Sequence, residues 1–367
     1  MDVSFPATPS PLAHVRALLS VVSALRAHDQ ELLLAAGAEA LAVVMDFATV
    51  AVNLYRPAFD DLEIAYVRGD DAARGALLGK TSELSHWDPL LDPRFDRGGA
   101  FFIPNEAYAR GDHVPAYVPD LPEPADGDGW HPDDALLLPL HSSSDGLLGI
   151  VSVDAPAAGR RPADADLDVL VAVAAHLAVA LEQLQRTAEI ERDRVAVQRL
   201  LEISARLARL DDPAAVLDGI VAAVHDALGF GRVVVARPRE DGFLWPIASA
   251  GWSAAELGAL APMRLDDLRG LLGAGRETSG CVLVTAAEAQ LLVASDLHAL
   301  FPSARNGRGR RAWQRHWLAV PLRAPDGRLL GLLWPDEPET RLLPTQAQLR
   351  ALRAFADQAV SALGRMR

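Results

Sequence analysis

The sequence holds a single cysteine, and this shortage excludes several kinds of site. Cys281 stands alone among 367 residues, so the chain can form neither an intramolecular disulfide nor a zinc site built from cysteines. Basic residues are also in the minority, and the net charge of −14 argues against a nucleic-acid-binding surface. No uncharged apolar run reaches the ~18 residues of a membrane span. Residues 1–11 lack the basic start and apolar run of a signal peptide. These shortages predict a soluble, cytoplasmic protein.

The sequence contains an internal repeat, whose first copy lies in residues 139–154 and whose second copy lies in residues 321–336. Matching residues keep the same spacing throughout, and weaker matches continue into the flanking helices. A repeat of this length covers a whole domain, so the chain is predicted to hold two copies of one fold. The first copy reads Pro139-Leu140, Asp145-Gly146, Leu147-Leu148-Gly149 and Asp154, and the second reads Pro321-Leu322, Asp326-Gly327, Leu329-Leu330-Gly331 and Asp336.

Hydrophobic periodicity and turn residues predict the same order of elements in both copies. That order is helix, helix, hairpin, a variable helical middle, a second hairpin and a long helix, which predicts an α+β fold with an antiparallel sheet flanked by helices. The first copy is predicted to have helices at 12–26, 30–45, 71–78, 84–91 and 164–186, strands at 49–55, 62–68, 101–104, 136–140 and 147–154, and an irregular segment at 112–134. The second is predicted to have helices at 194–209, 213–227 and 345–365, strands at 232–237, 244–250, 317–322 and 329–334, short helices within 253–300 and a loop at 303–311.

A single helix is predicted to join the two copies. Residues 164–209 contain no proline or glycine, and as one helix they would span about 68 Å. Apolar residues at alternating spacings of three and four form a heptad seam. One interpretation is that the seam packs on the sheet of its own domain, and the other is that it also pairs with a second chain in a homodimeric coiled coil. The side chains assigned to a dimer contact are Leu170, Leu177, Leu181 and Leu184.

The two closing hairpins resemble those of GAF domains. The resemblance lies in residues 136–140 with 145–154, and in residues 317–322 with 326–336. Residues 101–104, Phe-Phe-Ile-Pro, are similar to the Tyr-Phe-Ile-Pro strand of bacterial GAF sensors. The resemblance implies a GAF domain at 12–186 and another at 194–367, a shared signalling helix at 164–209 and a flexible lead-in at 1–11. In this family such helices form parallel dimers that transmit signals. The second copy departs from the pattern, because Trp334-Pro335 precedes Asp336 where two small or β-branched residues are usual.

The resemblance also implies a pocket between the sheet and the variable middle of each copy. An aromatic lining with a few polar groups suits a small planar ligand, and the arginines of residues 303–311 would suit an anion. Ordinary core and a solvated loop are the alternative interpretations. The candidate ligand-binding residues are Tyr55, Tyr66, Trp87, Phe101, Asn105, Tyr108 and Trp130 in the first copy, and Trp245, Trp252, Arg308 and Arg310 in the second.

Signatures of specific cofactors and of catalysis are missing. Val282 follows Cys281, where a bilin-binding GAF domain usually has histidine, and the ten histidines form no short metal-binding pair. The cyclic-nucleotide signature of the family is absent, and no nucleophile, Walker or dinucleotide motif occurs. The sequence therefore predicts a non-catalytic small-molecule sensor of unknown ligand, whose output lies in a further domain or a partner protein. The alternatives are a protein-interaction scaffold without a ligand and, more remotely, an enzyme that uses the pocket.

Overall fold

A computed structural model describes residues 29–107, 113–119, 124, 129–207, 209–259, 263–273, 277–293 and 303–366. The helix predicted at 12–26 and the lead-in at 1–11 lie outside these residues. The chain divides into two compact units, one of Met1–Arg56 with Asp60–Glu189 and the other of Pro57–Phe59 with Ile190–Arg367. They are called unit 1 and unit 2 below.

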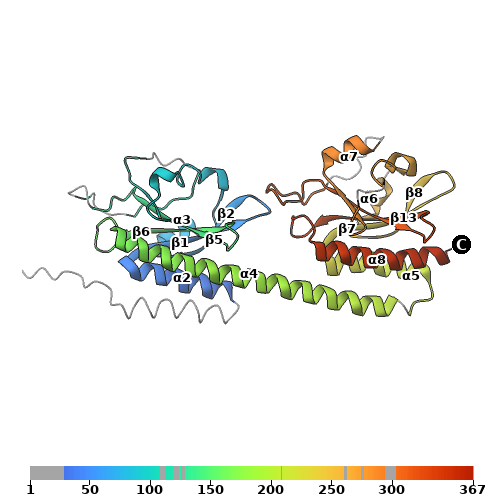
Figure 1. Cartoon of the computed structure of the whole chain (residues 1–367), viewed down its shortest axis with the longest axis horizontal. Coiled ribbons are helices and arrows are strands. Elements are labelled where there is room, and N and C mark those ends of the chain that lie inside the picture. Colours follow the sequence, from blue (N-terminus) through green and yellow to red (C-terminus); the bar gives the residue numbers. More distant parts are fainter. Residues whose placement is uncertain are drawn as a thin grey trace, which may run out of the picture. The chain divides into compact units, whose positions relative to one another are not determined.

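Unit 1 is one antiparallel sheet with helices on one face and shorter elements on the other (Figure 1). The order of its strands is β3-β2-β1-β6-β5-β4. Helices α2 and α4 cover one face, and α3 lies over the other. The elements are α2 (Gln30–Met45), β1 (Phe47–Arg56), β2 (Asp61–Arg68), α3 (Asp71–Leu77), β3 (Thr81–Glu83), η1 (Leu84–His86), η2 (Pro93–Phe95), β4 (Phe101–Ile103), β5 (Ala135–His141), β6 (Leu147–Pro156) and α4 (Asp164–Leu207).

Local chemistry explains where α2 begins and why it packs closely on α4. The carboxylate of Asp29 accepts hydrogen bonds from the backbone N–H groups of Glu31 and Leu32, which have no partner inside the helix. A Cβ atom on Gly37 would lie 2.6 Å from Cδ1 of Leu177, so a larger residue at position 37 would displace the Leu177 side chain. The two helices and the sheet enclose the main core of unit 1.

Unit 2 repeats this architecture with one more strand. The order of its strands is β10-β11-β12-β13-β7-β8-β9, which read backwards matches unit 1 with β10 added at the end. The predicted α+β fold with two antiparallel sheets is confirmed. The elements are α5 (Pro213–Leu228), β7 (Phe230–Pro238), β8 (Phe243–Ala250), α6 (Ala254–Ala259), β9 (Met263–Arg264), η3 (Leu265–Leu268), β10 (Glu277–Thr278), β11 (Cys281–Val284), α7 (Ala286–Leu292), β12 (Trp317–Arg323), β13 (Leu329–Pro338) and α8 (Gln346–Arg365).

The long helix is present, but its predicted dimer seam has another role. The side chains of Leu170, Leu177 and Leu181 have no exposed surface and Leu184 is also buried, all within the core of unit 1. The prediction that these four residues contact a second chain must be corrected, because their seam packs on α2 and the sheet. By length and composition α4 is also the one helix of the described residues that could span a membrane, yet half of its most apolar stretch is buried in the protein. It is therefore best described as a core helix.

Candidate functional site

A cavity of about 100 Å³ lies in unit 1, on the face of the sheet opposite α2 and α4. Alternate residues of β1 separate the two faces: Val50 and Val52 belong to the core beneath the helices, whereas Thr49, Ala51 and Asn53 line the cavity. Its other walls come from β2, β5, β6, α3 and the segments that connect the strands. The described lining is Thr49, Ala51, Asn53, Ile64, Leu77, Trp87, Leu90, Val114, Pro115, Ala116, Tyr117, Asp134, Ala135, Leu136, Leu137, Ser152, Val153 and Asp154.

Asn53 places a polar group deep in this cavity. Its side chain is only 2% exposed, and its Nδ2 donates to the carbonyl oxygen of Ile150 at 2.9 Å. That bond fixes the orientation of the amide, because a carbonyl accepts only from the NH₂ group. The register of β1 against β2 shifts between Val52 and Asn53, and such a bulge re-aims side chains. Among the described residues no donor reaches Oδ1 of Asn53, so this atom remains available to a ligand.

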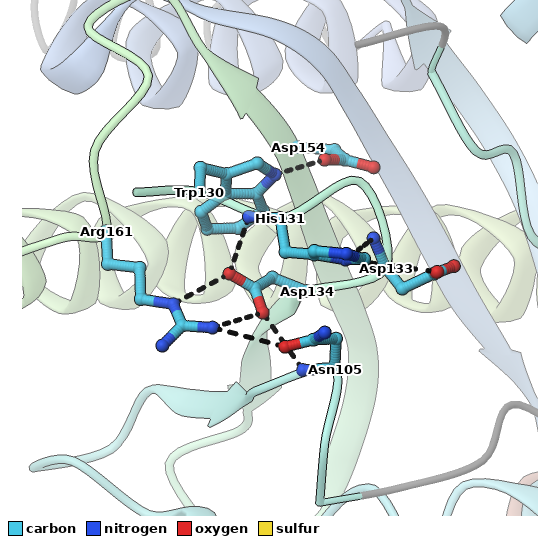
Figure 2. Close-up of polar contacts among 7 residues, drawn as sticks. All are labelled: Asn105, Trp130, His131, Asp133, Asp134, Asp154 and Arg161. Carbon is cyan, nitrogen blue, oxygen red and sulfur yellow. Dashed lines mark hydrogen bonds and ion pairs between the residues drawn. The ribbon is translucent and has the colours of Figure 1, made fainter. Parts of the chain in front are cut away.

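Asp134 joins the cavity to the start of α4 through a buried ion pair with Arg161 (Figure 2). The carboxylate is fully buried and accepts from Nε and Nη2 of Arg161 at 2.9 and 3.0 Å. Backbone N–H groups of Asn105 and His131 donate to the same carboxylate at 3.0 and 2.9 Å. Four donors on one carboxylate offset the desolvation of its charge. The cluster thereby ties together three segments that are distant in the sequence.

A tryptophan positions the second carboxylate of the cavity. Nε1 of Trp130 donates to Oδ1 of Asp154 at 2.9 Å (Figure 2). The indole is buried and packs at an angle against the rings of Phe47 and Phe102, with centroids 6.4 and 6.0 Å away. The sequence analysis predicted that Trp130 lines the cavity. In the structure Trp130 lies outside the lining and instead holds Asp154, which does line it.

In unit 2 the equivalent space is filled by tryptophan. Ser152 pairs with Ala51 across the sheet of unit 1, and Trp334 pairs with Val234 at the matching position of unit 2. The indole of Trp334 packs edge-on against Trp317, with centroids 5.1 Å apart, inside an apolar cluster. Beside it the described residues leave a cavity of only about 10 Å³, which is room for one water molecule. In the described part of unit 2, Trp334 of the departing Trp334-Pro335 pair thus occupies the space that forms the cavity in unit 1.

Of the candidates predicted in the first copy, the structure places only Trp87 in the lining of the cavity. Tyr55 donates its hydroxyl to Asp60 at 2.7 Å, and burial together with that carboxylate raises its pKa to about 12. Tyr66 and Phe101 pack against two separate hydrophobic clusters. Asn105 belongs to the Asp134 cluster. The remaining candidate, Tyr108, lies outside the described residues.

The candidates predicted in the second copy do not converge on one site. Trp245 lies under the guanidinium of Arg239 on the β7–β8 hairpin, and Trp252 lies under that of Arg232, at 4.4 and 4.8 Å. The side chains of Arg308 and Arg310 are exposed and line none of the described cavities. These positions offer no enclosed anion site within the described part of unit 2.

Cys281 has the properties of a structural residue. It is fully buried, its Sγ donates to the carbonyl of Leu349 at 3.5 Å, and burial raises the pKa of the thiol to about 11. A thiol that stays protonated is a poor nucleophile. Among the residues that the structure describes, no group of three His, Cys, Asp or Glu is arranged to hold a metal ion.

The polar residues that do line the cavity were missed by the sequence analysis. They are small or acidic, and all except Asp134 lie in strands whose other residues are mostly apolar. One signal was available for Asn53, which interrupts the apolar run Val50-Ala51-Val52 before Leu54. Another was available for Asp154, whose counterpart Asp336 recurs in the second copy. The polar lining consists of Thr49, Asn53, Asp134, Ser152 and Asp154.

Asp336 makes the stability of unit 2 depend on pH. Burial raises the pKa of its carboxyl from 3.8 to about 6. Because the folded state holds the proton more tightly than the unfolded state, this group contributes stability below about pH 4 that is lost as the pH rises through 6. We expect Asp336→Asn to stabilise unit 2 by roughly 1–3 kcal/mol at pH 8 and to have little effect at pH 4. Urea unfolding at both pH values measures the difference, and an equal effect at the two would contradict the assignment.

Comparison with known proteins agrees with this fold. Residues 212–363 match the family model of the GAF domain. A crystal structure of the bacteriophytochrome RpBphP3 from R. palustris covers 98% of this chain and 77% of its own, with a TM-score of 0.52 and 14% identity.

Two shorter structures match about half of the chain. The GAF domain of an Acinetobacter phosphoenolpyruvate-protein phosphotransferase covers 46% of this chain and 92% of its own, with a TM-score of 0.35 and 18% identity. Residues 122 to 287 of a methyl-accepting chemotaxis protein cover 45% of this chain and 96% of their own, with a TM-score of 0.35 and 21% identity. A search of curated protein sequences found no match. Residues 212–363 in the second half of the chain therefore match the GAF domain, and the first half has a GAF-like fold, because its strands follow the same order.

Proposed function

We propose that this chain is a non-catalytic sensor whose small-molecule ligand binds in the unit 1 cavity. GAF domains generally bind small ligands in sensory and signalling proteins. The observation that carries the proposal is the contrast between the two units at one position of the fold. Ser152 leaves a cavity with polar groups in unit 1, whereas Trp334 fills the matching space in unit 2. A mainly apolar cavity with a few polar groups is typical of a ligand site.

The Asp134–Arg161 pair supports a route from the ligand to α4. Asp134 lines the cavity, and Arg161 precedes Asp164, the first residue of α4, by one helical turn of sequence. At the other end of the sheet, the backbone N–H and the hydroxyl of Ser143 donate to Glu182 of α4 at 2.9 and 2.8 Å. A ligand that displaces the cavity wall near Asp134 therefore shifts the start of α4 relative to its anchor at the hairpin. Such a switch works when the two positions of α4 differ little in free energy.

The signal leaves unit 1 along α4 in a parallel homodimer. The outer face of α4 carries Val179, Ile190, Val197 and Leu201, whose side chains are each more than half exposed. At about 100° per residue these four lie within an arc of about 40°. This outer stripe replaces the buried seam as the contact between two copies of the chain. The protein is cytoplasmic in this proposal, and a further domain or a partner protein reads the position of α4.

Charges placed in the outer stripe are expected to dissociate the dimer. We expect Val197→Glu combined with Leu201→Glu to weaken self-association at least 100-fold, because four carboxylates would be brought together in the contact. Gln198→Glu adds a carboxylate to another side of the same helix and serves as the control. Sedimentation equilibrium measures the dissociation constants. A monomeric wild-type chain at micromolar concentration, or equal dissociation constants for all three proteins, would contradict the contact.

Native mass spectrometry of freshly purified protein tests the ligand. A retained small-molecule mass that is absent from a variant with a filled cavity supports the sensor. A wild-type protein that carries no ligand and binds nothing in a metabolite library favours the interaction scaffold instead.

A further inference from the structure

We propose that the β7–β8 hairpin of unit 2 is a docking site for an acidic segment of a partner protein. The hairpin borders an open groove of about 600 Å³. This inference goes beyond the proposed function and does not depend on a ligand in the unit 1 cavity. The lining of the groove includes Arg237, Arg239, Trp245 and Ile247, together with the turn residues Glu240 and Asp241.

The internal repeat allows this hairpin to be compared with the β1–β2 hairpin of unit 1. Asn53 pairs with Ile150 in unit 1, and Ala236 pairs with Leu332 in unit 2. Ile150 and Leu332 follow the matching glycines of the two closing hairpins. Asn53 and Ala236 are therefore equivalent, and the residues that follow them can be matched one by one.

In unit 1 the hairpin compensates the charge of its own arginine. Leu54 pairs with Glu63, and Arg56 pairs with Asp61, across β1 and β2. The guanidinium of Arg56 donates to Asp61 at 2.7 Å and to Glu63 at 2.9 Å. Both acidic residues of the hairpin therefore face one cation.

Unit 2 has aromatic residues where unit 1 has these two carboxylates. Arg237 pairs with Trp245, so the indole takes the place of Glu63. The backbone N–H of Arg239 donates to the carbonyl oxygen of Phe243 at 2.9 Å, so the phenyl ring takes the place of the Asp61 carboxylate. The hairpin thereby loses two acids, and it gains a second arginine where unit 1 has leucine.

The two arginines of the groove form no ion pair with the described residues. The guanidinium of Arg239 lies over the ring of Trp245, 4.4 Å from its centroid. A guanidinium stacked in this way still presents N–H groups at its edge, and these suit a carboxylate. Asp241 instead accepts from the backbone N–H of Phe243 at 2.9 Å. The groove therefore offers two cationic donors to an incoming anion.

Apolar surface lies beside these donors. Pairing in β8 passes from Ala248 directly to Pro246, which leaves Ile247 as the extra residue of a bulge. The side chain of Ile247 is 36% exposed, and Trp245 is half-buried. Arginine and tryptophan are the residues that most often carry the binding energy of protein interfaces. A small anion would use the arginines alone, whereas a segment with an acidic residue beside an apolar residue would use the whole groove.

The charge of the whole chain favours a short acidic segment over a larger polyanion. The net charge is −14, which opposes approach to a nucleic acid or to an anionic bilayer over their whole surface. A short segment needs only the local contact, since charges more than about 8 Å away are largely screened at physiological ionic strength.

Three labelled peptides separate charge from apolar contact. Their sequences are Glu-Leu-Glu-Leu-Glu, Gln-Leu-Gln-Leu-Gln and Glu-Gly-Glu-Gly-Glu, and fluorescence anisotropy measures their binding to the full chain. We expect the first peptide to bind about 10-fold more tightly than either of the others, because it alone matches both the arginines and the apolar surface. Trp245→Glu restores the acidic residue found in unit 1 and should weaken this binding about 10-fold. Arg310→Gln removes an exposed arginine outside the groove and serves as the control.

Equal binding of the glutamate–leucine and glutamine–leucine peptides would overturn the proposal, as would binding that Trp245→Glu leaves unchanged or no binding at all. Vesicles that contain phosphatidylserine provide a further comparison. If they bind and the peptides do not, and Trp245→Glu abolishes that binding, the groove would belong to a membrane contact. Arg237→Leu restores the leucine of unit 1 and should also weaken peptide binding, so the test holds if Trp245→Glu does not fold. Ser152→Trp should leave peptide binding unchanged, which separates this site from the proposed ligand site.

Discussion

Replacing Arg161 by methionine is expected to lower the free energy of unfolding of unit 1 by about 3–5 kcal/mol. The methionine keeps most of the apolar stem but removes the guanidinium that donates two hydrogen bonds to the carboxylate of Asp134. Asp134 is fully buried, and the backbone N–H groups of Asn105 and His131 do not neutralise its charge. A buried charge that loses its partner is far more destabilising than a broken ion pair at the surface.

The neighbouring arginine provides a matched control. Arg160 pairs with Asp166 at 2.7 Å, but half of its side chain is exposed, so Arg160→Met is expected to change stability by less than about 1 kcal/mol. Combining Asp134→Asn with Arg161→Met removes the buried charge and should restore part of the loss. Chemical denaturation followed by far-UV circular dichroism measures all three. Equal effects of the two arginine substitutions would show that the Asp134 cluster is not buried as described.

Replacing Ser152 by tryptophan is expected to reduce ligand binding to unit 1 at least 100-fold while unit 1 still folds. Tryptophan occupies the matching position of unit 2, where Trp334 pairs with Val234 and packs against Trp317. An indole at position 152 would enter the cavity of about 100 Å³ and exclude the ligand by volume. Some strain is expected, of about 1–3 kcal/mol, because the walls did not evolve around this side chain.

Two further variants distinguish filling of the cavity from general damage. Ser144→Trp places the same side chain on the exposed tip of the β5–β6 hairpin and should leave binding unchanged. Trp334→Ser is the reverse exchange in unit 2 and should destabilise that unit by about 3–5 kcal/mol, because it empties a packed core. Thermal unfolding measures the stability of both variants, and native mass spectrometry measures the small molecule that each one retains. Undiminished binding by a folded Ser152→Trp variant would remove the cavity as the ligand site.

Local signals in the sequence predicted most of the fold. Asp212 caps α5, Pro213 is its first residue, and Gly229 ends it in the left-handed conformation, each for a reason that acts within a few residues. The sequence analysis did not predict the elements that depend on contacts between residues far apart in the sequence. The strands β3 and β10 have three and two residues and exist only because a neighbouring strand pairs with them. The helix predicted over 84–91 shortened to the single turn η1, Leu84–His86.

The heptad seam on α4 shows what periodicity leaves undecided. The spacing correctly predicted a helix with an apolar face, but not the partner of that face. The sheet and α2 of unit 1 occupy it, and the exposed stripe lies on another side of the helix. Periodicity describes one helix, whereas the choice of partner depends on the whole fold.

The candidate site was harder to predict because a cavity depends on side chains that are small. The sequence analysis selected aromatic residues, and most of them, including Phe101 and Tyr66, fill hydrophobic clusters. The cavity remains open because Ala51 and Ser152 leave space between larger neighbours. A small residue in a strand looks the same whether it borders a cavity or a close contact. The sequence contained one informative difference, which is Trp334 at the position that matches Ser152. Recognising that these two positions face equivalent spaces required the register of the strands in both sheets.

The stoichiometry of a bound small molecule tests most directly the claim that the duplicated fold has one ligand site, in unit 1. Native mass spectrometry of freshly purified protein measures it for the wild type, for Ser152→Trp and for a variant with Arg308→Ala and Arg310→Ala. The account predicts one bound molecule per wild-type chain, none after Ser152→Trp, and one when the two arginines are replaced. Two molecules per chain, or binding that survives Ser152→Trp and is lost with the arginines, would contradict it.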